Sequence, residues 1–158
     1  MAIRVRREVN RSEGRLPASG VNILAGQAVM IDGDGKFTNF ADAGSTLTPY
    51  GLADVSNVTL PLAGSDGVTV GQGYDYTNFA RGGLVGAFLN GGEFSLFDDG
   101  RGKPFIDTDT YLVNGKVYVV KSGADTGKIT SVAVGPEIGT VVEVTGSPVD
   151  TLVIKVTL

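Results

Sequence analysis

Short apolar runs, rich in valine, isoleucine and other β-branched residues, follow one another along this chain from residue 21 to its end. Glycine, proline, asparagine and aspartate separate them roughly every eight to twelve positions. Several runs alternate apolar and polar residues, and β-branched side chains favour the pleated surface of a sheet. The pattern predicts an all-β, single-domain β-sandwich or β-barrel of short antiparallel strands, and it does not decide between the two. We expect strands over residues 21–24, 28–31, 36–40, 51–58, 67–70, 83–89, 93–97, 117–121, 129–134, 139–144 and 151–157.

Two stretches of the chain resemble each other. Residues 26–38 and residues 115–130 each hold an apolar run, an acidic turn with glycine, and a second run. Glycine and asparagine accept the positive φ angles that tight hairpins require. A further matching piece follows each copy, at 50–55 and at 138–144. The body of the domain, residues 20–158, is therefore predicted to contain two similar hairpin units, at about 26–70 and 115–158.

Composition argues against catalysis. The 158-residue chain contains neither histidine nor cysteine. Their absence removes the commonest general base, the usual zinc ligands and every Ser-His or Cys-His nucleophile. We therefore expect that the protein is not an enzyme and needs no cofactor. No run of about 18 apolar residues is present, so no membrane contact is expected. The N-terminus lacks the apolar segment of a secretory signal.

Two acidic segments are candidate cation sites. The sequence Asp-Gly-Asp-Gly at 32–35 resembles the start of a calcium loop, but Lys36 and Phe37 occupy the positions where such a loop needs an oxygen ligand and a glycine. A hairpin turn is the better interpretation. The connection 98–110 is predicted to be a solvated contact loop rather than a metal site, although it carries four carboxylates: Asp98, Asp99, Asp107 and Asp109.

Residues 1–19 differ from the rest of the chain in charge. Five arginines and two glutamates give this segment a net charge of +3, which leaves −7 for the remainder of a chain whose total is −4. We predict an extended N-terminal arm that docks on an acidic or phosphate-bearing neighbour, the alternative being a frayed terminus. Deletion of residues 1–15 is expected to leave a folded body and to weaken its attachment. The candidate partner-binding residues of the arm are Arg4, Arg6, Arg7, Arg11 and Arg15.

An aromatic cluster gives a second candidate site. Tyr74, Tyr76 and Phe79 lie close together in the sequence, beside Arg81. Such a group can stack on a ligand or anchor a protein interface. Packing beneath a loop explains it equally well.

Glycine placement and strand order together resemble a known family. The matching features are the basic N-terminal arm, Gly-Gln-Ala-Val-Met-Ile at 26–31 with Gly-Lys-Phe at 35–37, Gly-Leu-Val-Gly-Ala-Phe at 83–88, the run 117–121, and Ile-Gly-Thr-Val-Val at 138–142. Over residues 20–158 the chain is similar to the capsid decoration, or cement, proteins of tailed bacteriophages.

The resemblance implies a virion structural protein without catalytic residues. Such proteins bind the outer surface of the phage head, often as homotrimers, and clamp neighbouring major capsid subunits. The implied location is the exterior of the capsid. Direct nucleic-acid binding is not expected, because the body is acidic and phosphate contact needs a basic surface.

Two other functions remain open. The chain is also compatible with another phage structural protein, associated with the tail or a fibre. A carbohydrate- or surface-binding β-sandwich module, using the tyrosines at 74 and 76 with Phe79, is the alternative from a different class.

Overall fold

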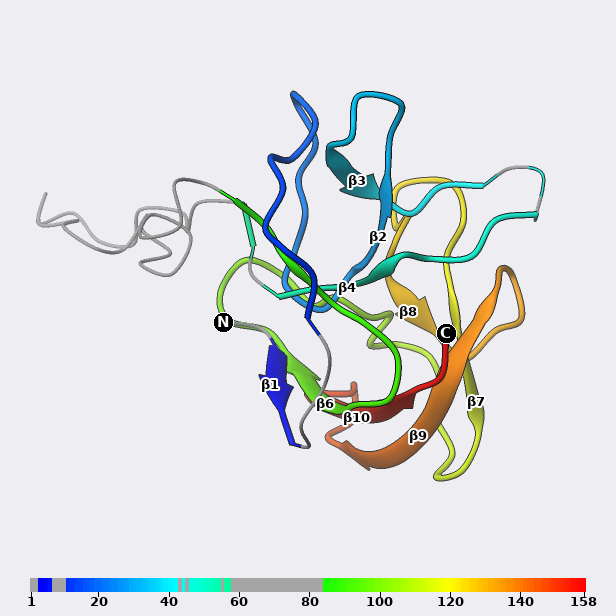
Figure 1. Ribbon diagram of the computed structural model, residues 1–158. Coiled ribbons are helices and arrows are strands. Elements are labelled where there is room, and N and C mark those ends of the chain that lie inside the picture. The colour runs from blue at the N-terminus through cyan, green and yellow to red at the C-terminus, as the bar shows by residue number, and fades with distance from the viewer. Residues whose placement is uncertain (1–2, 7–10, 43, 45, 55, 58–83) are drawn as a thin grey trace, which may run out of the picture.

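A computed structural model describes residues 3–6, 11–42, 44, 46–54, 56–57 and 84–158. Over these residues the chain forms ten strands in two antiparallel sheets and contains no helix, so none that could cross a membrane. The sheets lie as two layers (Figure 1), and neither closes into a barrel. The all-β prediction is confirmed, and of its two forms the sandwich is the one observed.

The larger sheet has six strands in the order β1-β6-β10-β9-β7-β8. Its longest ladders join β10 to β9 and to β6. The strands are β1 (Ile3–Val5), β6 (Glu93–Phe97), β10 (Thr151–Val156), β9 (Glu137–Thr145), β7 (Lys116–Val119) and β8 (Ile129–Thr130).

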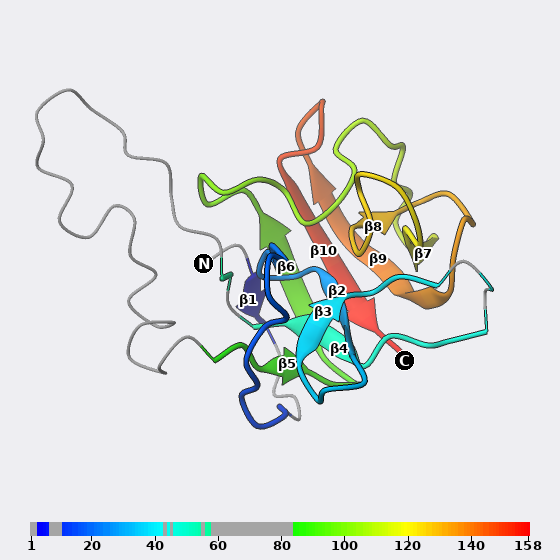
Figure 2. The same cartoon turned by 90° about the horizontal axis from the view of Figure 1, so that it is seen from above.

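The smaller sheet has four strands in the order β3-β2-β4-β5. Its strands are short: β3 (Phe37–Asn39), β2 (Ala28–Ile31), β4 (Gly51–Ala53) and β5 (Ala87–Phe88). In the view of Figure 2, this sheet lies in front of the larger one.

One connection plan occurs in both sheets. In each sheet, two consecutive strands form a hairpin, and the next strand in the chain pairs with the first strand of that hairpin. A fourth strand then pairs with the third. The resulting orders are β3-β2-β4-β5 and β8-β7-β9-β10. The third strand carries a glycine in both cases. A Cβ at Gly51 would come within 2.5 Å of the Phe88 carbonyl oxygen, and one at Gly139 would overlap the Lys155 carbonyl oxygen. Both glycines therefore permit a close approach of the fourth strand.

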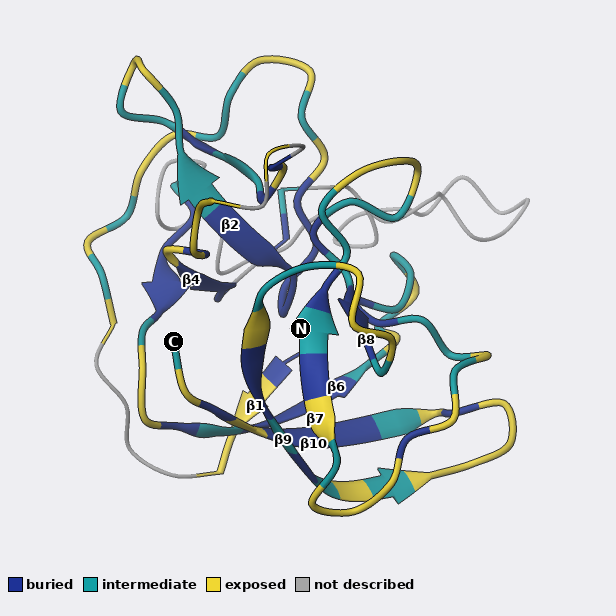
Figure 3. Cartoon of the chain, turned by 90° about the vertical axis from the view of Figure 1, so that its right-hand side faces the viewer, coloured by how far each residue is buried: buried dark blue, intermediate teal, exposed yellow. Residues whose placement is uncertain are grey.

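The core has two parts, on opposite sides of the four-stranded sheet. Neighbouring residues in a strand point to opposite faces. Leu52 accordingly joins the large cluster between the two sheets, whereas Ala53 joins a smaller cluster on the other face. That smaller cluster also contains Ile23, Val29 and Phe37. Figure 3 shows buried residues along the strands and exposed ones mostly at the turns.

The expected strands differ from the observed ones mainly in length. Strands β2 and β6 have the expected bounds, and β9 is longer. Strand β7 begins one residue before its expected range, and the other strands that lie in expected ranges are shorter. The expected strand at 67–70 lies outside the described residues.

The expected strand at 21–24 is wrong. Side chains take the place of a neighbouring strand there, because they accept the backbone N–H groups of the segment. Ile23 donates to Asn57 Oδ1 (2.7 Å), Leu24 to Gln27 Oε1 (2.8 Å) and Ala25 to Ser56 Oγ (2.8 Å).

The connection after β6 is more firmly packed than a contact loop would be. Phe105 is 1% exposed and forms an isolated bridge to Ile129. The Tyr111 hydroxyl lies 2.9 Å from the Ile106 carbonyl oxygen and 3.1 Å from that of Ile129. Burial, helped by the nearby Asp109 carboxylate, raises the pKa of Tyr111 well above its ordinary value. The aromatic residues of this connection therefore belong to the body of the domain.

Candidate partner-binding surface

The first described residues of the basic arm form an edge strand of the six-stranded sheet. Strand β1 pairs antiparallel with β6, with Arg4 opposite Ser95. Ile3 is fully buried in the large core cluster. Because side chains alternate along a strand, Arg4 and Arg6 then lie on the outer face of this sheet. The arm begins as part of the folded body.

Residues 11–18, which we call the strap, hold the two edges of the four-stranded sheet. At the β5 side, Arg15 and Val85 exchange a pair of backbone hydrogen bonds of 2.8 and 2.9 Å, and Ser12 donates to the Ala87 carbonyl. At the β3 side, Phe37 donates to the Leu16 carbonyl at 3.0 Å, and Ala18 donates to the Phe37 carbonyl. The strap therefore satisfies strand edges that would otherwise be open.

These contacts argue against the expectation that deletion of residues 1–15 leaves the body folded. Removing that segment takes Ile3 out of the core and removes the strap's bonds to the β5 side. The sequence did not reveal this, because an arginine-rich segment with serine, glycine and proline has the composition of a tether.

Arg11 makes a pair with a buried carboxylate. It forms a salt bridge with Asp54, whose side chain is 1% exposed, and its guanidinium lies 5.9 Å from the centre of the Phe88 ring. Asp54 also accepts a hydrogen bond from the Gly86 backbone at 2.8 Å. A buried carboxylate needs such partners to offset its lost hydration. Arg11 therefore fixes the strap to its own chain.

Arg15 and Arg6 also contact their own chain. The Arg15 guanidinium donates to the Gly35 carbonyl at 2.9 Å. Arg6 donates from Nε to Ser95 Oγ (2.9 Å) and from Nη1 to Glu143 Oε2 (2.8 Å). Val153 lies between Ser95 and Glu143 in the strand register and is fully buried. Arg6 thus crosses the sheet above Val153 and covers it.

Arg4 lies in a different setting from the other described arginines. Its guanidinium stacks over the Phe97 ring, 5.2 Å from the ring centre. Together with Arg6, Ser95 and Thr151, these two residues line a hollow of about 340 Å³ on the outer face of the sheet. It lies beside β1, an edge strand of the six-stranded sheet.

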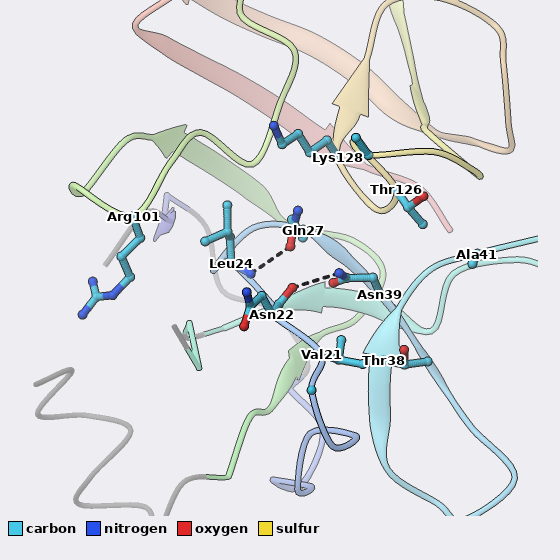
Figure 4. Close-up of a pocket in the computed structure, with 12 residues that line it drawn as sticks. Val21, Asn22, Leu24, Gln27, Thr38, Asn39, Ala41, Arg101, Thr126 and Lys128 are labelled. Atoms are coloured by element: carbon cyan, nitrogen blue, oxygen red, sulfur yellow. Dashed lines mark hydrogen bonds between the residues drawn. The ribbon is translucent and has the colours of Figure 1, made fainter. Parts of the chain in front are cut away.

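A larger cleft of about 550 Å³ lies beside β3 (Figure 4). Asn39 donates from its amide to the Asn22 carbonyl at 2.8 Å, while its Oδ1 atom is buried and has no hydrogen-bond partner among the described residues. The described residues that line the cleft include no aromatic side chain. A sugar ring would therefore find no stacking surface among them.

The acidic residues considered as cation ligands bind loop backbone and neighbouring side chains. Asp32 Oδ1 accepts hydrogen bonds from the backbone of Asp34 (3.0 Å) and Lys36 (2.9 Å), which confirms the predicted hairpin turn. Asp98 likewise caps the backbone at Gly100 and Gly102. Within the described ranges, no group of three or more acidic side chains is placed to hold a metal ion.

Two further carboxylates of the connection 98–110 have specific partners. A hydrogen bond from Lys103 lowers the pKa of Asp107. Asp109 accepts hydrogen bonds from the Thr130 hydroxyl and the Ser131 backbone. These carboxylates hold the connection against β8 and its own backbone.

Five predicted site residues lie outside the described residues: Arg7, Tyr74, Tyr76, Phe79 and Arg81. Their roles stay predictions. Conversely, sequence reasoning missed Ser95, Phe97 and Thr151 as lining residues. The alternation in 93–97 does place Ser95 and Phe97 on the face opposite Phe94. The local sequence, however, contains no signal that strand β1, with Arg4, pairs with this strand.

Comparisons with known proteins give a single informative result. No family model matches the chain, and no curated protein matches it. Among solved structures, a chain of "The capsid of Myoviridae Phage XM1" has a TM-score of 0.55 and 16% sequence identity to this one. The match covers 96% of this chain and 84% of the other. At this identity, the likeness shows a common fold.

Proposed function

We propose that this protein is a structural component of a tailed-phage virion, which binds the outer surface of the head and stabilises it by clamping neighbouring major capsid subunits. The observation that carries the proposal is the fold shared, over 96% of the chain, with a chain from a phage capsid structure. The resemblance of the sequence to capsid decoration proteins supports the same role. This role requires no catalytic residue.

The distribution of charge and side chains supports binding to a protein surface. Arginine and aromatic residues are enriched at the centres of interfaces, and the outer face of the six-stranded sheet presents Arg4 stacked on Phe97. The chain as a whole is acidic, at −4, while residues 1–19 are basic. Such an uneven charge distribution orients a protein as it approaches its partner and makes association sensitive to salt.

The proposal includes a homotrimer as the binding unit and the major capsid protein as the partner. A clamp must contact more than one shell subunit, and a trimer placed over a threefold joint meets that requirement by symmetry. Several weak contacts made at once then act as one strong attachment.

The test begins with the mass of the purified protein by light scattering, followed by co-sedimentation with emptied, expanded phage heads. We expect a trimer and saturation of the heads at a fixed ratio to the major capsid protein. Isolated tails serve as the control particle. Failure to sediment with heads would overturn the proposal, and binding to tails alone would indicate a tail or fibre component.

A further inference from the structure

The hollow at Arg4 has the features of a binding site for a single carboxylate. We propose that Arg4, supported by Arg6, Ser95, Phe97 and Thr151, binds an aspartate or glutamate side chain of the partner protein. The inference rests on the proposed function for the identity of that partner. Its chemistry rests on the geometry of the hollow alone.

Arg4 has hydrogen-bonding capacity that its own chain does not use. An arginine side chain has five N–H donors in a planar fork. Within the described part of the chain, the Arg4 guanidinium makes no hydrogen bond or ion pair, and it contacts the face of the Phe97 ring in a cation-π interaction. Stacking on an aromatic ring holds the guanidinium plane while leaving its N–H edge free. That edge is suited to a bidentate carboxylate.

Arg6, in the same hollow, differs from Arg4 because its charge is paired. Its guanidinium is bonded to Ser95 and paired with Glu143. The positive charge of Arg6 is therefore balanced locally, and Arg4 supplies the uncompensated charge of the hollow. Arg6 acts as a positioning residue, because it fixes the Ser95 hydroxyl on the floor beside Arg4.

The remaining polar groups of the hollow are hydroxyls. Ser95 Oγ accepts the hydrogen bond from Arg6, which leaves its own hydrogen available as a donor. The Thr151 hydroxyl makes no hydrogen bond within the described residues and lines the same hollow. A guanidinium edge with two hydroxyl donors matches a ligand that only accepts, and a carboxylate is such a ligand. The hollow, at about 340 Å³, is large enough for an acidic side chain with its stem.

The surroundings favour one carboxylate over a polyanion. Glu143 is paired with Arg6, and Glu93 lies on the same strand as Ser95. Their charges, with the net −7 of the chain beyond residue 19, oppose the approach of nucleic acid or another dense anion. A partner protein can supply a single negative charge without bringing others.

The first experiment tests the chemistry on the full-length protein alone. Sodium acetate is titrated against sodium chloride at constant ionic strength, and backbone amide and arginine Nε–H signals are followed by NMR. We expect saturable shifts at Arg4, Ser95 and Phe97 that disappear in Arg4→Ala. The control Lys36→Ala removes one positive charge from the β2–β3 turn and should leave them unchanged.

Two results would overturn the carboxylate assignment. One is a set of shifts that do not saturate or that survive in Arg4→Ala. The other is binding of inorganic phosphate at least ten times tighter than acetate, which would indicate a phosphate site. The Arg4→Ala amide spectrum also reports whether the variant is folded, and Arg4→Gln provides a second variant of closer size.

The second experiment separates this inference from the proposed function. Wild type, Arg4→Ala, Arg4→Lys and Lys36→Ala are each co-sedimented with expanded heads. We expect Arg4→Ala to bind at least tenfold more weakly and Arg4→Lys to be intermediate, because lysine lacks the bidentate fork. Lys36→Ala should bind like wild type. If Arg4→Ala binds as well as wild type, the inference fails and the function stands. If wild type does not bind, the function fails, and the acetate titration still decides the chemistry.

Discussion

The two sheets share a strand order but are stabilised differently. In the six-stranded sheet, β9 and β10 are nine and six residues long and pair along the whole of β10, with one register shift between Val153 and Ile154. In the four-stranded sheet, no strand exceeds four residues, and β5 has two. The strap, from the start of the chain, binds both edges of this smaller sheet. The same arrangement of strands is thus stabilised by long strand pairing in the six-stranded sheet and by the strap in the four-stranded sheet.

This difference explains why the basic arm has a structural role in stabilising the four-stranded sheet. Short strands bury little apolar surface and leave a large share of their backbone groups at open edges. Among the described residues, the smaller core cluster contains six buried ones, and Val85 and Phe37 within it are bonded to the strap. We therefore expect the stabilities of the two sheets to respond unequally to the same deletion or to equivalent substitutions.

Deletion of residues 1–18 should have the largest effect. It removes five strap hydrogen bonds, each contributing about 1 kcal/mol, and the buried side chain of Ile3. We expect the free energy of local opening of the four-stranded sheet to fall by about 5 kcal/mol from the hydrogen bonds, while the loss of Ile3 weakens the six-stranded sheet less. Hydrogen exchange should show loss of protection in β3 and β5 first, with β9 and β10 retained.

Ile3→Ala is the matched control for that deletion. It removes core packing on the six-stranded side and leaves the strap in place. Equal loss of protection in both sheets after the deletion, or no loss at all, would show that the strap does not stabilise the smaller sheet.

Substitution of the two matching glycines should have a smaller effect. Gly51→Ala and Gly139→Ala each place a Cβ against a carbonyl oxygen of the neighbouring strand. We expect each to cost about 1–3 kcal/mol in unfolding free energy by urea titration. Gly139→Ala should cost more, because the long β9–β10 ladder cannot move aside, whereas the short β4–β5 pair can separate locally. Gly33→Ala, with open space around the new Cβ, is the control. Equal costs at both positions would contradict the proposed difference in ladder rigidity.

Tyr111→Phe should have the smallest effect, about 1 kcal/mol at neutral pH, from lost hydrogen bonding. The variant also tests how the free energy of unfolding depends on pH. The folded state raises the pKa of Tyr111 above its ordinary value of 10.0. The stabilisation is therefore fully present below pH 10 and is lost as the pH rises through the higher folded-state pKa. Urea titrations between pH 8 and about 11 should show a steeper loss for wild type than for Tyr111→Phe. Parallel curves would show that the hydroxyl is not held in its neutral form.

Local patterns in the sequence are enough to predict the class of fold and the positions of most described strands. Alternation within 93–97 and 151–157 predicted strands β6 and β10, because side chains two positions apart on a strand share a face. The acidic glycine turn at 32–35 predicted the β2–β3 hairpin for an equally local reason, since Asp32 bonds to backbone two and four residues away. These features depend on neighbours in the chain, so a single sequence carries them.

The conformations and contacts of the remaining segments depend on residues far away in the sequence. Residues 21–24 have the pattern of a strand, but Asn57 and Ser56, more than thirty positions away, accept the backbone N–H groups of Ile23 and Ala25. The hollow at Arg4 depends on the pairing of β1 with β6, whose residues are about ninety positions apart. Such pairings are selected by the burial of Ile3 and by satisfaction of strand edges across the whole fold. Local periodicity contains no information about which distant strand will supply the partner, and the candidate site could be found only once the sheets had been assembled.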